Sequence, residues 1–186
     1  MRRAAVTIAT ALALAGCSQT MKLSYESPPV APSTAELKPV GIAVVDKRRY
    51  VEYGDKDPWY LGTRSRGDDT RDLNIRNKLP LAHELRKDVI GDLAALGFKV
   101  SGDADIRQLT VEIHDWRVQI ADAARLTYDL RLEVTDGRGT TVLDTRLKED
   151  ARIEVANLEP EVNAAYVKLV RRILRDNGEV RAAISR

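Results

Sequence analysis

Residues 125–134, Arg-Leu-Thr-Tyr-Asp-Leu-Arg-Leu-Glu-Val, decide the fold of this chain. Polar and apolar side chains alternate throughout, which is the pattern of a β-strand with one buried and one solvent-facing side. Residues 136–139, Asp-Gly-Arg-Gly, then favour a tight hairpin turn. The chain returns with the same alternation, so the sequence predicts an antiparallel strand pair. The residues expected to face inward on the return strand are Leu143, Leu147, Ala151, Ile153 and Val155.

The stretch before this pair predicts another strand, with a break in its alternation. Apolar residues occupy every odd position from Leu109 to Ile113, and every even position from Trp116 to Ile120. Because a shift of one residue exchanges the two faces of a strand, we predict a bulge or bend near His114-Asp115. Earlier in the chain, the nearly continuous apolar run Val40–Val45 predicts a strand buried on both faces.

Two helices are predicted around these strands. Across Leu81–Leu96 apolar residues recur at helical spacing, with Pro80 suited to a first turn and Gly97 to the left-handed position that ends a helix. The second helix spans Asn157–Ile173, where Asn157 is a favourable N-terminal cap. Asn177-Gly178 interrupts it, and a short charged tail is expected to close the chain.

This order of elements is typical of a single α+β domain over residues 37–186. We predict two layers, with a mostly antiparallel sheet of four to five strands and two helices packed on one face. The segment is long enough for one self-sufficient core and too short for two comfortable ones.

The first 16 residues are predicted to be a cleaved secretory signal. Arg2 and Arg3 precede the apolar run Ala4–Ala15, which is shorter than the roughly 20 residues that a membrane-spanning helix needs. The run leads into residues 14–17, Leu-Ala-Gly-Cys, which resemble the bacterial lipobox. The resemblance implies that Cys17 becomes the mature N-terminus and is acylated.

The residues after the cleavage position predict a tether and a location. Residues 17–36 hold the lipidated Cys17 and a Pro- and Ser-rich stretch, which is typical of a flexible spacer. In lipoproteins of two-membrane bacteria an aspartate after the cysteine typically retains the protein in the inner membrane. Ser18 stands there in this chain, so the resemblance implies the outer membrane, with the domain facing the periplasm. The inner membrane stays open as an alternative.

Charge and cysteine content narrow the function classes. The chain carries 30 Lys and Arg against 28 Asp and Glu, and loss of Arg2 and Arg3 with the signal leaves 28 of each. A neutral mature chain argues against a nucleic-acid binder, which normally has a basic surplus. Cys17 is the only cysteine, so the core has no internal disulfide to support it.

No residue pattern points to catalysis or metal binding. His83 and His114 have no cysteine or histidine partner at ligand spacing, and the chain contains no nucleophile elbow, phosphate-binding glycine loop or dinucleotide fingerprint. The paired carboxylates, such as Asp68-Asp69, stand in charged, turn-like sequence. We therefore expect no enzyme activity, no catalytic residue, no metal and no cofactor.

The segment Asp46–Asn77 is the strongest candidate for binding. A connection this long is uncommon unless it is functional or disordered, and this one is rich in aromatic residues and arginines. Residues 51–53 and 59–61 could form a small hairpin around residues 54–58. Tyr, Trp and Arg are enriched at binding hot spots, but the segment could instead pack its aromatics on the sheet edge. The candidate partner-binding residues are Tyr50, Tyr53, Trp59, Tyr60, Arg64 and Arg66.

The mature chain resembles, in its layout, the YajG-like lipoproteins, a group of unknown function. The resemblance implies an envelope location and a fold but no activity. This chain departs from the pattern of the group at residues 64–69, where relatives often have a glycine- and aromatic-rich stretch. The matching features are the lipobox at Cys17, the strand Val40–Val45, Tyr50-Val51, Gly54-Asp55-Lys56, Gly62, Pro80-Leu81-Ala82 and Ala95-Leu96-Gly97-Phe98.

These observations favour a lipid-anchored, non-enzymatic periplasmic module that binds an envelope protein partner or helps to assemble it. The membrane is then a partner through the acylated Cys17, and nucleic acid is not. One alternative is an accessory lipoprotein of a lipid-trafficking ABC transport system, which an apolar groove under the helices would favour. Another is a small-ligand or cell-wall-glycan binder that stacks sugars on Tyr53, Trp59 and Tyr60. A hydrolase comes last.

Overall fold

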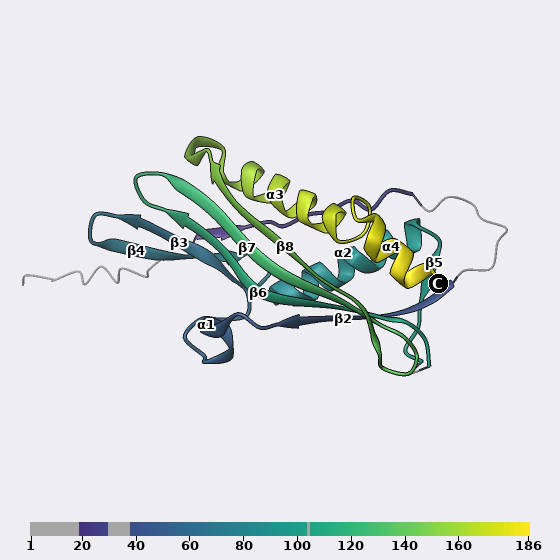
Figure 1. The fold of residues 1–186 in the computed structure, drawn as a ribbon. Coiled ribbons are helices and arrows are strands. Elements are labelled where there is room, and N and C mark those ends of the chain that lie inside the picture. The colour runs from purple at the N-terminus through teal and green to yellow at the C-terminus, as the bar shows by residue number, and fades with distance from the viewer. Residues whose placement is uncertain (1–18, 30–37, 104) are drawn as a thin grey trace, which may run out of the picture.

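The computed structural model describes residues 19–29, 38–103 and 105–186 (Figure 1). The predicted signal peptide, Cys17 and residues 30–36 of the predicted tether lie outside these residues. The strands are β1 Gln19–Met21, β2 Lys38–Asp46, β3 Tyr60–Arg66, β4 Asp69–Ile75, β5 Phe98–Val100, β6 Gln108–Ile120, β7 Ala124–Thr135 and β8 Thr141–Ile153. The helices are α1 Arg49–Glu52, α2 Leu81–Ala95, α3 Leu158–Ile173 and α4 Gly178–Ser185, with a 3₁₀ turn, η1, at Val155–Asn157.

The sheet is organised around β6. On one side β6 pairs with β7 in antiparallel fashion along its whole length, and β8 follows beyond β7. On the other side β6 has two parallel partners in succession, first β2 at Gln108–Ile113 and then β3 at Val118–Ile120. β5 extends the sheet beyond β2, and β4 and β1 extend it beyond β3. The sheet therefore divides into two branches at the middle of β6.

The division coincides with the predicted bulge in β6, which is confirmed. The β6–β7 register shifts between Ile113 and Asp115, so His114 has no paired residue in β7. The extra residue returns Trp116 to the face that carries Val111, and both side chains are fully buried. A bulge bends its strand and increases its twist, which separates the direction of β2 from that of β3.

The predicted sheet was wrong in size and type. The sheet has eight strands and is mixed, with parallel β1–β4, β2–β5, β2–β6 and β3–β6 pairs, instead of four to five mostly antiparallel strands. There are four α-helices in the described residues instead of two. The parallel pairs join segments far apart in sequence, which alternation within a strand does not encode. The α+β class is broadly correct.

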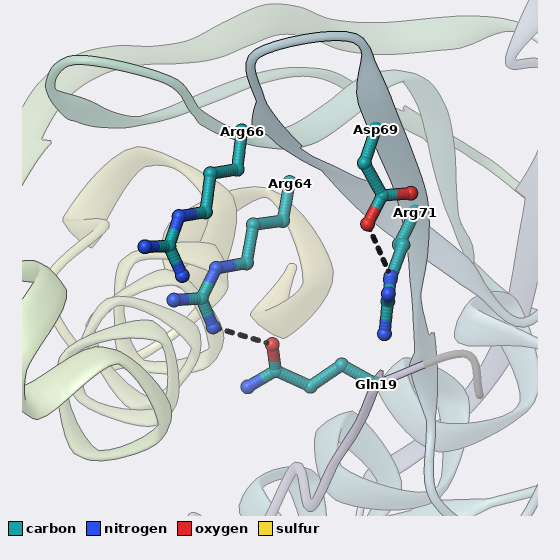
Figure 2. Close-up of a pocket in the computed structure, with 5 residues that line it drawn as sticks. All are labelled: Gln19, Arg64, Arg66, Asp69 and Arg71. Atoms are coloured by element: carbon teal, nitrogen blue, oxygen red, sulfur yellow. Dashed lines mark hydrogen bonds and ion pairs between the residues drawn. The ribbon is translucent and has the colours of Figure 1, made fainter. Parts of the chain in front are cut away.

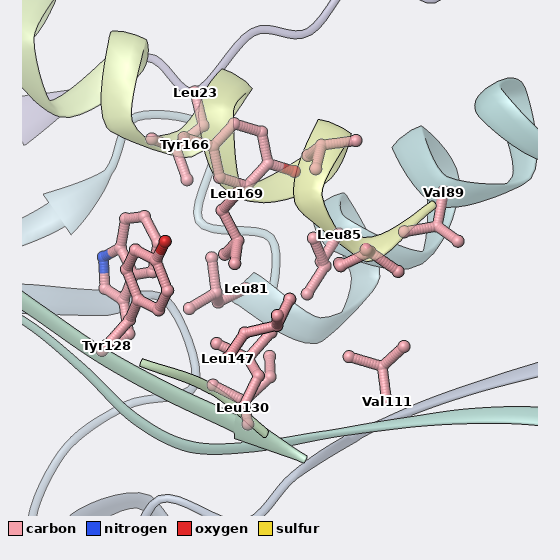
Figure 3. Close-up of a cluster of buried hydrophobic side chains, with 14 of the residues drawn as sticks. Leu23, Leu81, Leu85, Val89, Val111, Tyr128, Leu130, Leu147, Tyr166 and Leu169 are labelled. Carbon is pink, nitrogen blue, oxygen red and sulfur yellow. The ribbon is translucent and has the colours of Figure 1, made fainter. Parts of the chain in front are cut away.

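The three longer helices, α2, α3 and α4, cover one face of this sheet (Figure 1). Trp116 lies at the centre of the contact, where its ring stacks on Tyr128 at 5.9 Å between centroids and meets Tyr166 edge-on at 6.1 Å. The predicted stripe of α2 is buried from Leu81 to Leu93, and Figure 3 shows Leu81, Leu85 and Val89 among the core side chains. Gly97 has a φ of 84°, as predicted for the position after a helix.

Several smaller predictions about burial need correction. The expected charged tail forms α4, because Val180 and Ile184 stand one helical turn apart and both pack into the core. Val155 was expected to face inward but is 43% exposed, since β8 ends at Ile153 and η1 turns the chain away. β2 is not buried on both faces throughout, because Ala43 is exposed.

Gly62 marks the place where β3 approaches β6. It pairs with Val118, and a Cβ added to Gly62 would lie 1.9 Å from the Val118 carbonyl oxygen. Because the obstacle is backbone, Gly62→Ala must push the two strands apart. We expect the free energy of unfolding, measured by urea denaturation, to fall by about 1–3 kcal/mol. Gly102→Ala is the matched control, since an added Cβ there meets nothing within 4 Å. Equal stability of the two variants would contradict the close contact.

Candidate functional site

The N-terminal segment, defined here as residues 19–29, packs on the domain. β1 pairs with β4, and Met21 and Leu23 are buried in the core. The backbone N–H of Lys22 donates to Glu159 Oε1 at 3.0 Å, and that of Ser24 donates to Asn163 Oδ1 at 2.7 Å. The segment thus runs beside α3 (Figure 1), and this part of the predicted tether lies against the domain.

A buried charge fixes the far part of this segment. The Tyr25 hydroxyl donates to Asp92 Oδ1 at 2.6 Å, and Arg175 Nε donates to the same oxygen at 3.0 Å. Asp92 is fully buried on α2, so its carboxylate depends on these two donors. Burial and the neighbouring Asp92 raise the pKa of Tyr25 to about 12. The segment is therefore held by a hydrogen-bonded charge cluster as well as by apolar packing.

The β3–β4 hairpin carries a cavity lined by arginines (Figure 2). Its volume is about 300 Å³, and its walls are Gln19, Arg64, Arg66, Asp69 and Arg71. Arg64 pairs with Arg71 across the hairpin, and Arg66 pairs with Asp69, so all four side chains share one face of the sheet. Arg71 Nε donates to Asp69 Oδ2 at 2.8 Å, and Arg64 Nη1 donates to Gln19 Oε1 at 3.2 Å. The cavity can accept an anion.

The aromatic part of the predicted binding segment is built around a buried arginine. Arg48 is fully buried and holds the Asp46 carboxylate through Nε at 2.8 Å and Nη2 at 2.7 Å. It also donates to the carbonyl oxygens of Tyr60 at 2.6 Å and Pro58 at 2.9 Å. A charge-assisted arginine fork of this kind fixes the geometry of the chain around it. Arg48 thus orders the path from β2 to β3.

Two of the predicted binding tyrosines make internal contacts in the same place. The Tyr50 hydroxyl donates to the Trp116 carbonyl oxygen at 2.7 Å, and its ring meets Tyr60 edge-on at 5.4 Å. Burial raises the pKa of Tyr50 to about 12. Tyr60 is only 6% exposed. The predicted hairpin around residues 54–58 is wrong, because residues 49–52 form α1 and the hairpin is β3–β4, turning at Gly67-Asp68.

The structure does not gather the six predicted binding residues into one site. Trp59 is half-buried against the core, whereas Tyr53 is 76% exposed at the end of α1. Arg64 and Arg66 lie further along β3 from Tyr60, and at about 3.3 Å per residue the distance from position 60 to 66 is roughly 20 Å. Of the six, Arg64 and Arg66 line the same cavity.

Gln19, Asp69 and Arg71 also line that cavity and were not among the predicted residues. A signal was available for two of them, because Arg64 and Arg66, like Asp69 and Arg71, are spaced two apart around Gly67-Asp68. A hairpin over residues 64–71 places these four charged side chains on one face of the sheet. Gln19 had no such signal, since the β1–β4 pair joins distant parts of the chain.

The face of the sheet opposite the helices carries charges that pair with one another. Arg131 Nη2 lies 2.8 Å from Asp144 Oδ2, and Arg125 Nη2 lies 2.7 Å from Asp150 Oδ2. His114, at the bulge, lies 3.0 Å from Glu112. Such solvent-exposed pairs contribute little to stability, but they leave this face without a strong field of either sign.

The described residues contain neither a cluster of metal ligands nor a helix that could span a membrane. Across 19–29, 38–103 and 105–186, no three His, Cys, Asp or Glu side chains are grouped so that they could hold a metal ion. No helix in the same ranges is long and apolar enough to cross a membrane.

Comparison with known proteins identifies the fold. No family model matches the chain, and no curated protein matches it significantly. The solved protein XCC0632 from Xanthomonas campestris, of the family DUF330, is similar over 85% of this chain and 92% of its own, with a TM-score of 0.58 and 10% identity. A second solved, uncharacterised protein is similar over 86% and 97%, with a TM-score of 0.51 and 10% identity.

A minor lipoprotein from Acinetobacter baumannii covers 75% of this chain and 94% of its own, with 12% identity and a TM-score of 0.41. At these identities the likeness of the first two structures extends to the fold alone, and that of the third is too weak to show even this. The resemblance to the YajG-like lipoproteins is not confirmed by a family model and stays a prediction.

The Tyr25–Asp92 bond provides a test of how the N-terminal segment is held. Tyr25→Phe removes one of two donors to a buried carboxylate, so we expect the free energy of unfolding at pH 9 to fall by about 1–2 kcal/mol. The pKa of Tyr25 rises from 10.0 to about 12 on folding, so its contribution is lost as pH rises through that window.

The difference between the wild type and Tyr25→Phe, measured by urea denaturation, should therefore shrink between pH 10 and pH 12. Tyr53→Phe is the control, because that side chain is 76% exposed. A difference between wild type and Tyr25→Phe that stays constant over this range would contradict the proposed bond.

Proposed function

We propose that this protein is a lipid-anchored, non-enzymatic module of the bacterial envelope that binds a protein partner or helps to assemble it. Acylation at Cys17 is supported by the sequence Leu14-Ala15-Gly16-Cys17. We place the protein at the outer membrane, with the domain in the periplasm, because Ser18 and not an aspartate follows the cysteine.

The free edge of β8 is the observation that carries the binding proposal. β8 is 13 residues long and pairs only with β7 among the described residues, so its outer row of backbone N–H and C=O groups has no strand partner there. A long edge of this kind can accept an extended segment of another protein as a further strand. Lys148, 61% exposed, and Asp150, 53% exposed, are charges that discourage nonspecific pairing along it.

The alternative functions have less support. The accessory-lipoprotein hypothesis depends on an apolar groove under the helices, but Leu23 of the N-terminal segment is buried in the core, and the backbone of this segment is hydrogen-bonded to α3. The glycan-binding hypothesis depends on an exposed aromatic platform, but Tyr60 is 6% exposed and Trp59 is half-buried. Only Tyr53 of the three is open to solvent.

Acylation is tested at Cys17. Cys17→Ser should abolish labelling by a palmitate analogue and should release the protein from the membrane fraction or leave its signal uncleaved. Ser18→Ala, which keeps the cysteine, is the control and should retain both label and membrane association. Unchanged labelling of Cys17→Ser in living cells would refute the anchor.

The binding surface is tested by photo-crosslinking in living cells, with mass spectrometry of the adducts. A photoreactive residue at position 148 on β8 should give a discrete protein adduct. The comparison position is 53 at the end of α1, which is 76% exposed. An adduct from position 53 alone would move the site to the Asp46–Asn77 segment and contradict the β8 proposal. No adduct from either position in a correctly localised protein would refute a protein partner.

A further inference from the structure

The arginine cavity of the β3–β4 hairpin contains more positive charge than its neighbours compensate. Three arginines face it, against the single carboxylate of Asp69. Arg64 stands directly opposite Arg71 in the hairpin register, an arrangement of like charges that is destabilising on a sheet surface. Asp69 forms its ion pair with Arg71. Within the part of the chain that the structure describes, no carboxylate lies at ion-pair distance from Arg64 or Arg66.

The form of the cavity suits an anion with several oxygen atoms. Arg64 and Arg66 extend in the same direction from β3, and Arg71 faces them from β4 with Gln19 between (Figure 2). Guanidinium groups present planar forks of N–H donors that match phosphate oxygens, and they keep their charge at any physiological pH. Convergent arginines therefore favour phosphate over a simple point ion. A bound phosphate would also relieve the repulsion between Arg64 and Arg71.

The cavity lies beside the predicted anchor. Gln19, one of its walls, is separated from Cys17 by Ser18 alone. Consecutive Cα atoms are 3.8 Å apart, so two peptide units span at most about 8 Å. An acylated Cys17 would therefore bring this end of the domain to the headgroup layer. The closeness of the cavity to the anchor therefore favours a lipid headgroup as the source of the phosphate.

We infer that the β3–β4 hairpin binds the phosphate groups of anionic phospholipids in the leaflet that holds the acyl chains of Cys17. This inference rests on the proposed lipid anchor and adds a second attachment to it. Arg64 and Arg66 supply the free donors, Arg71 completes the cavity, and Asp69 weakens the attraction. An acyl anchor alone attaches the domain to the membrane at one residue. A phosphate contact at the hairpin also fixes the orientation of the domain on the membrane.

The opposite end of the sheet is a poor competitor for this role. The β7–β8 turn presents Arg138, which is exposed, next to Asp136. Backbone N–H groups of Arg138 and Thr140 hold the Asp136 carboxylate and lower its pKa, so the turn carries a fixed negative charge beside its arginine. This turn lies far from the β3–β4 hairpin (Figure 1), so Arg138 is a control for the loss of an arginine elsewhere on the domain.

The test separates headgroup binding from acylation. The mature chain, residues 17–186 with Cys17→Ser, is mixed at low ionic strength with vesicles of phosphatidylglycerol and phosphatidylcholine in equal parts, or of phosphatidylcholine alone, and sedimented. Each arginine near an anionic surface contributes about fivefold to binding. We expect Arg64→Gln/Arg66→Gln to weaken partitioning to the anionic vesicles about 20- to 30-fold, and Arg138→Gln to leave it unchanged.

Asp69→Asn should change partitioning in the opposite direction, with far-UV circular dichroism confirming that the variant is folded. Removing the one carboxylate should strengthen partitioning a few-fold, and added salt should weaken it in every variant. Equal partitioning of Arg64→Gln/Arg66→Gln and Arg138→Gln, or no preference for anionic vesicles, would overturn the inference. So would binding of inorganic phosphate, observed by NMR of the arginine side chains, without partitioning to vesicles. Failure of the Cys17 labelling test alone would instead refute the anchor and leave the vesicle result intact.

Discussion

The bulge in β6 is the constraint on which the rest of the structure depends. Without it, the apolar residues from Trp116 to Ile120 would face solvent, because they stand one position out of phase with Leu109–Ile113. The unpaired residue restores them to the core, where Trp116 packs against Tyr128 and Tyr166. The same bend lets one strand support β2 along its first half and β3 along its second. One inserted residue thus serves both core packing and the division of the sheet.

The branch of the sheet formed by β3, β4 and β1 ends in the β3–β4 hairpin. In β4, Leu73 and Ile75 are buried in the core, whereas Asp69 and Arg71 toward the turn are exposed. The face that is apolar near β6 therefore becomes charged toward the end of the hairpin, without a change in strand direction. Gly62 allows this branch to form, because only a residue without a Cβ fits against the Val118 carbonyl. The arginine cavity is thus a consequence of how β3 is joined to β6.

Short stretches of sequence predicted the elements whose residues show a clear strand or helix pattern. The alternation in β6, β7 and β8, the bulge at His114 and the helix ending before Gly97 were all visible in short windows of sequence. The β3–β4 hairpin had only a weak signal, the two-residue spacing of its charges around Gly67-Asp68, since only Tyr60 and Leu61 of β3 are buried apolar residues and its outer half is polar on both faces. Its existence depends on pairing with β6. The one-turn spacing of Val180 and Ile184 fits a helix, but the charges around them led to the prediction of a charged tail instead of α4.

The predicted binding residues also include two distinct groups, those that line the cavity and those that make internal contacts. Residue type alone selected Arg64 and Arg66, but it also selected Tyr50 and Tyr60, whose contacts are internal. Tertiary structure separates the two kinds, because Arg48 draws the aromatic part of the segment onto the sheet while the hairpin extends the arginines away from it. The parallel β1–β4 pair then places Gln19 beside those arginines. No local pattern encodes that contact, although it is the one that brings Gln19, two positions after the predicted anchor, beside the charged hairpin.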